Sequence, residues 1–65
     1  MKKKELQKIA KQIAKAEKVI SNPESSKTDV YKAKNLICEL TGHLSELEDY
    51  AAVDELVQEI LNENS

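Results

Sequence analysis

The chain has 65 residues and a formal net charge of −2, with one cysteine, one histidine and neither tryptophan nor phenylalanine. A domain of this length buries only about 60% of its unfolded surface and is marginally stable alone. Such domains are usually stabilised further by a disulfide, a bound metal or a second chain. A single cysteine excludes an internal disulfide, and one cysteine with one histidine excludes the usual four-ligand zinc site within one chain. Association with another chain is the stabilising interaction that remains.

The charges are divided between the two halves of the chain. Residues 1–34 hold all ten lysines and four acids, giving +6, while residues 35–65 hold eight acids and no lysine or arginine, giving −8. This asymmetry bears on the choice of partner rather than on the fold. No apolar run follows the lysines at positions 2–4, and no stretch approaches about 20 apolar residues. We therefore expect no signal peptide, no membrane segment and a cytoplasmic protein.

The first predicted helix covers residues 5–20. Its apolar residues alternate in spacing between three and four, which is typical of one buried helix face, and they are Leu6, Ile9, Ile13, Ala16 and Ile20. The opposite face carries a lysine stripe made of Lys4, Lys8, Lys11, Lys15 and Lys18. A break follows at 21–28, where Asn22 with Pro23 is one candidate for the helix cap and Ser26 with Asp29 is the competing one, so the next helix should start between Pro23 and Thr28.

The second predicted helix covers residues 28–47 and has the heptad spacing of a coiled coil. Its apolar stripe is Val30, Ala33, Ile37, Leu40, Leu44 and Leu47. If the chain reverses at the break, Ile20 pairs with Val30 and Leu6 with Leu44, and every such pair of residue numbers sums to 49 or 50. That constancy predicts an antiparallel helical hairpin. Gly42 lies within this helix, and a helix break there is the alternative.

The third predicted helix covers residues 49–62, because the apolar spacing shifts phase after Leu47. Its apolar residues are Tyr50, Val53, Leu56, Val57, Ile60 and Leu61. Either this helix folds back to complete a three-helix bundle, or it packs against another copy. The connection at Glu48 and Asp49 has no glycine or proline for a sharp reversal. We therefore expect an all-α homo-oligomer, with these six residues in the interface between copies.

The lysine stripe is the most visible candidate site. Lysines aligned along a helix can neutralise phosphates, which indicates nucleic acid or a nucleotide as an anionic ligand. A solvated helix face explains the same pattern without a ligand, and the stripe lacks the arginine and aromatic residues of common nucleic-acid motifs.

No combination of residues indicates catalysis. Glu39, His43 and Glu46 lie on neighbouring turns, but bundle metal sites draw on several helices, so a surface histidine is the simpler interpretation. Cys38 has no base at the spacing that nucleophilic use requires, and a small packing residue is the default. Tyr31 and Tyr50, the two aromatic residues, suit either a partner interface or the ends of the hairpin. We expect no enzyme activity, no metal and no cofactor.

Three segments carry a resemblance: Ile-Ala-Lys-Gln-Ile-Ala-Lys-Ala-Glu-Lys-Val-Ile at 9–20, Leu-Thr-Gly-His-Leu at 40–44, and the acidic run from residue 47 to residue 61. Together they resemble short uncharacterised helical proteins of bacterial phages and prophages. The resemblance implies a small effector or inhibitor that acts by binding, in a bacterial or infected host cell. The expected function is therefore a non-enzymatic interaction protein, which binds a protein partner, assembles with itself or does both.

Overall fold

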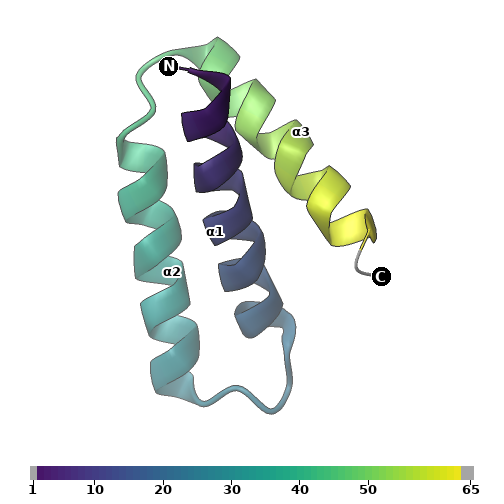
Figure 1. The fold of residues 1–65 in the computed structure, drawn as a ribbon. Helices are drawn as coiled ribbons and strands as arrows, with labels where there is room; N and C mark the ends of the chain where they lie inside the picture. The colour runs from purple at the N-terminus through teal and green to yellow at the C-terminus, as the bar shows by residue number, and fades with distance from the viewer. Residues whose placement is uncertain (1, 64–65) are drawn as a thin grey trace.

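The computed structural model describes residues 2–63, and it folds them into three α-helices without a β-strand in that range. They are α1 (Lys3–Ser21), α2 (Lys27–Gly42) and α3 (Leu47–Glu63). Figure 1 shows α2 running antiparallel to α1 on one side, while α3 descends along the other side from the end where α1 begins. The all-α prediction, with a helical hairpin and a C-terminal helix, is confirmed at this level.

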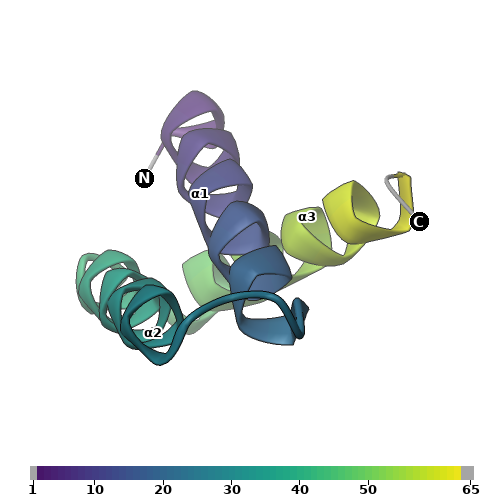
Figure 2. The same ribbon diagram turned by 90° about the horizontal axis from the view of Figure 1, so that it is seen from below.

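Helix α1 is the central element, because it packs against both α2 and α3 whereas those two scarcely contact each other. Seen along the bundle, α2 and α3 diverge on the two sides of α1 (Figure 2). The buried cluster accordingly takes most of its members from α1, and it consists of Leu6, Ala10, Ile13, Ala14, Leu44, Val53 and Val57.

The connection between α1 and α2 is organised by short-range hydrogen bonds. The side-chain oxygen of Asn22 accepts from the Glu24 N–H at 3.0 Å, and the extended backbone of Asn22 suits the residue before Pro23. The Ser26 hydroxyl accepts from the Asp29 N–H at 3.1 Å, which caps the start of α2. Of the two caps that the sequence left open, the structure has the one at Ser26.

Two alanines of α1, Ala10 and Ala14, are 0% and 1% exposed although neither belongs to the predicted apolar face of that helix. They belong to the same buried cluster as Val53 and Val57 of α3. Small side chains on one helix let the backbone of a second helix approach closely. Helix α1 therefore has two packing faces, one for α2 and one for α3, where the sequence predicted one.

Helix α2 ends at Gly42, five residues before the predicted end at Leu47, so the alternative break is the correct one. Amides in the four-residue connection bond back over three residues, with His43 N–H donating to Leu40 and Leu44 N–H to Thr41. Leu44 stays buried at 4% exposure, but Leu47 is 87% exposed and leaves the predicted stripe. The break is favourable because it lets α3 bury its own apolar face on α1.

We predict that Gly42→Ala raises the free energy of unfolding by about 0.5–1 kcal/mol. Gly42 has no positive φ, and a Cβ built there meets no atom within 4 Å. Alanine therefore fits the folded chain and reduces the conformational freedom of the unfolded one. Urea unfolding monitored by circular dichroism measures the difference. A lower stability in the variant would contradict this account of the break.

Helix α3 folds back within its own chain, which is one of the two arrangements that the sequence left open, and association between copies stays a prediction. Val53 and Val57 are 4% and 3% exposed in a single chain, so they are covered by α1 and cannot meet a second copy without unfolding α3. The hydroxyl of Tyr50 donates to the Thr41 carbonyl at 2.9 Å and ties the start of α3 to the end of α2. The reversal takes place at 43–46, ahead of the predicted connection at Glu48.

Candidate protein-binding surface

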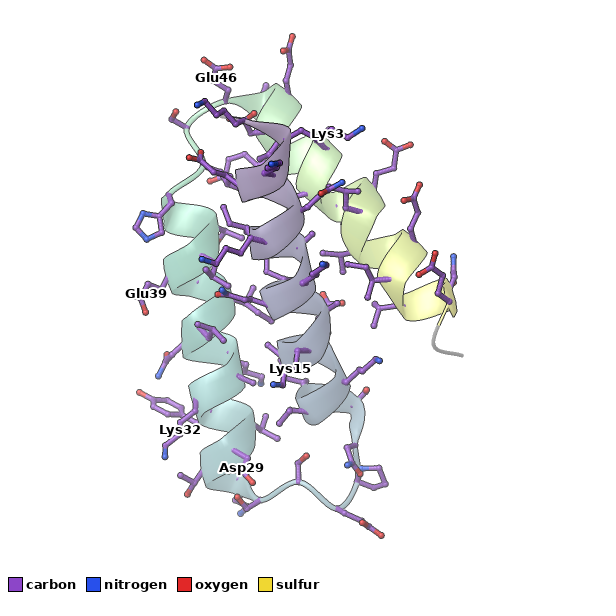
Figure 3. All side chains as sticks on the ribbon, viewed as in Figure 1. Lys3, Lys15, Asp29, Lys32, Glu39 and Glu46 are labelled. Carbon is purple, nitrogen blue, oxygen red and sulfur yellow. The ribbon has the colours of Figure 1, made fainter. Side chains whose placement is uncertain are left out.

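A groove of about 500 Å³ lies between α1 and α2, on the side away from the buried cluster. Its lining is Gln12, Lys15, Ala16 and Val19 of α1, Ser25 of the connection, and Asp29, Lys32, Ala33 and Leu36 of α2. Figure 3 shows Lys15, Asp29 and Lys32 around its rim. The groove therefore has an apolar floor between charged edges.

The groove forms because the two helices meet through small residues. Ala16 and Ala33 are buried at 4% and 7% exposure, and neither side chain is large enough to fill the space beside it. Leu36 borders this space and remains 38% exposed, while Val19 is half-buried. An apolar floor of this kind gains free energy when another apolar surface covers it.

Neither Val19 nor Leu36 belongs to the predicted apolar stripe of its helix. Both lie beside the heptad positions rather than on them, so the three-and-four spacing passes them by. Each is an apolar residue just outside an apolar stripe, so it widens the apolar face of its helix. That extra width is the feature of the sequence that could have indicated the groove.

All five residues of the lysine stripe are exposed. At 3.6 residues per turn they fall within about 80° of arc and span about 21 Å along α1. These lysines lie in different surroundings: Lys15 lines the α1–α2 groove, whereas Lys11 lines a second groove between α1 and α3. That second groove also contains Glu59 and Glu63, so the stripe does not lie on a uniformly basic surface.

The six residues expected at an interface between copies occupy different places. Tyr50, Val53 and Val57 line a cleft of about 180 Å³ to which all three helices contribute. Leu56 and Ile60 are half-buried and line the α1–α3 groove of about 210 Å³. Leu61 packs against the buried cluster. Another molecule can reach surface on Leu56, Ile60, Leu61 and Tyr50 without disrupting α3, because the three aliphatic residues are half-buried and Tyr50 is 41% exposed.

The structure keeps the remaining polar candidates apart. His43 follows α2 at its end, Glu39 lies on the exposed side of α2, and Glu46 lies in the connection at the end of the molecule where α1 begins (Figure 3). Within residues 2–63, no three His, Cys, Asp or Glu side chains are grouped so that they could hold a metal ion. Cys38 is exposed rather than packed, which corrects its expected role, and Tyr31 is 67% exposed.

Comparisons with protein-family models, with curated proteins and with solved structures gave no significant match. In the part of the chain that the structure describes, no helix has the length and apolar character needed to cross a membrane.

Proposed function

We propose that this chain is a non-enzymatic interaction module, of the effector or inhibitor type, whose α1–α2 groove receives an amphipathic helix of a partner protein. The single observation that carries the proposal is the groove itself, with its apolar floor and charged rim. Helix-in-groove recognition needs a hydrophobic channel for residues spaced three and four apart, and two antiparallel helices with small residues at their contact provide one.

The rim charges specify which helix fits. Lys15 on α1 and Lys32 on α2 stand on opposite edges of the groove, with Asp29 nearer its end (Figure 3). Helix α1 as a whole has six lysines against two glutamates, giving +4. A partner helix with an apolar stripe and acidic residues on both sides of it therefore matches the floor and the edges together.

We predict that Leu36→Glu weakens binding of such a helix by at least about tenfold, since it places a charge on the apolar floor. The probe is a fluorescein-labelled peptide of about 18 residues with leucine and alanine on one face and glutamates on its flanks. Fluorescence anisotropy measures its affinity. The matched control is Leu47→Glu, which changes an exposed leucine outside the groove and should leave the affinity unchanged.

A second peptide of the same apolar face with lysine flanks tests the charge assignment, and it should bind more weakly than the acidic one. Equal loss of binding in the Leu36 and Leu47 variants would contradict the groove as the site. Failure of the acidic peptide to bind at all at low salt would overturn the proposed function.

The alternative function is binding of nucleic acid or a nucleotide by the lysine stripe, favoured by the exposure of all five lysines on one side of α1. Its signature is affinity that falls steeply with salt and is lost in K8Q/K11Q/K15Q. Leu36→Glu should leave anion binding nearly intact, which separates the alternative from the helix-binding proposal. The acidic wall formed by Glu59 and Glu63 beside Lys11 opposes an extended polyanion on that side.

A further inference from the structure

The groove between α1 and α3 carries charges of opposite sign on its two walls. Lys11 stands on the α1 wall, Glu59 and Glu63 stand on the α3 wall, and the half-buried apolar residues Leu56 and Ile60 lie between them. This arrangement is part of a wider division, since α1 has a charge of +4 and α3, with six acids and no basic residue, has −6.

A surface with a basic wall and an acidic wall is complementary to itself. In a twofold dimer the same patch serves both copies, so each residue must find its complement on that one patch. A twofold axis along the groove places the α1 wall of one copy on the α3 wall of the other. Rotation about this axis keeps every residue at its own level along the groove, and Lys11, Glu59 and Glu63 line the same groove, so they meet across the contact.

We propose that two copies of the chain associate across the α1–α3 groove about a twofold axis, with Lys11 of each copy facing Glu59 and Glu63 of the other. Leu56 and Ile60 of both copies are covered at the centre of this contact. Lys8 lies one turn before Lys11 and Glu55 one turn before Glu59, so the charge match extends along the helices. The proposal retains the predicted homo-oligomer but moves its contact away from Val53 and Val57.

This dimer is independent of the proposed helix binding. The α1–α2 groove lies on the other side of the lysine stripe and shares no lining residue with the α1–α3 groove. Both copies would therefore keep an open helix-binding groove, and a partner with two suitable helices would bind with increased avidity.

The test is charge reversal on one wall at a time, with mass measured by sedimentation equilibrium at low salt. In a dimer of Lys11→Glu, the α1 wall and the α3 wall are both acidic, so like charges meet in both of the two equivalent contacts. In a dimer of E59K/E63K both walls are basic, and like charges again meet in both contacts. We expect each variant alone to dimerise at least about tenfold more weakly than the unmodified chain. An equimolar mixture of the two should recover dimers, because each glutamate wall then meets a lysine wall in both contacts.

Two further proteins complete the design. Lys32→Glu makes the same charge change on α2, outside the α1–α3 groove, and should dimerise like the unmodified chain. The triple reversal K11E/E59K/E63K should dimerise with itself. A monomeric mass for the unmodified chain at up to about 1 mM, equal weakening by Lys32→Glu, or a mixture that stays monomeric would each overturn the proposal. Circular dichroism of every variant verifies that the helices are retained, as expected for exposed positions.

Discussion

Replacing Val57 with glutamate should unfold the chain at room temperature. Val57 is 3% exposed in the cluster where α3 meets α1, so the new carboxylate would be buried without a partner charge. The penalty is about 3–5 kcal/mol, which is comparable with the whole stability expected of so small a domain. Loss of the helical circular dichroism signal measures it directly. Because α1 uses both of its sides for packing, we expect the hairpin to lose helicity together with α3.

The neighbouring substitution Gln58→Glu is the matched control, since it adds the same carboxylate one residue further along α3 at an exposed position. Its effect on the free energy of unfolding should stay within about 0.5 kcal/mol. If Val57→Glu kept a fully helical chain with an unchanged melting temperature, α3 would not be packed on α1 in solution.

Leu44→Ala should lower the free energy of unfolding by about 2–5 kcal/mol, because it removes a buried side chain and leaves a cavity. Leu44 is 4% exposed and lies in the connection that joins α2 to α3, within the same cluster as Leu6 and Val53. Chemical unfolding in urea gives the change in stability. Only the loss of packing is involved, since Leu44 contributes no polar side-chain group.

Leu47→Ala is the control that makes this measurement decisive for the fold. Leu44 and Leu47 both belong to the apolar stripe of an uninterrupted second helix, whereas the structure buries the first and leaves the second 87% exposed. The change at Leu47 should therefore alter stability by less than about 0.5 kcal/mol. Similar losses in the two variants would favour the uninterrupted helix over a break after Gly42.

The hairpin was predictable because its signals are local and repeated. The alternating spacing in residues 5–20 and the capping serine at Ser26 each act within a few residues. The agreement in register between the first two apolar stripes then predicts the reversal of the chain. These features correspond to α1, to the start of α2 and to their antiparallel packing.

The return of α3 could not be predicted from the same spacing. Leu40, Leu44 and Leu47 continue the heptad through Gly42, so local periodicity favours a longer helix. The break is decided instead by burial of Val53 and Val57 against α1, a tertiary effect. Ala10 and Ala14, which receive α3, carry no signal in the sequence because alanine is a strong helix former on any face and both lie outside the apolar stripe of residues 5–20.

The candidate site was predictable only in part. The lysine stripe follows directly from residue spacing, and all of its members are exposed as expected of a polar helix face. The α1–α2 groove depends on the distance between the two helices. Ala16 and Ala33 help to set that distance, and Val19 and Leu36 border the space that results. That separation is a property of the packed pair, and neither helix alone contains it.

The most direct test of the proposed function is an NMR titration of the isotope-labelled protein with the acidic amphipathic peptide. We expect the amide signals of Val19, Ala33 and Leu36 to shift in a saturable manner, while those of Val53 and Leu56 on the far side of α1 remain in place. Shifts confined to the lysine stripe and abolished by moderate salt would indicate simple charge attraction. Shifts centred on α3 would contradict the α1–α2 groove as the binding site.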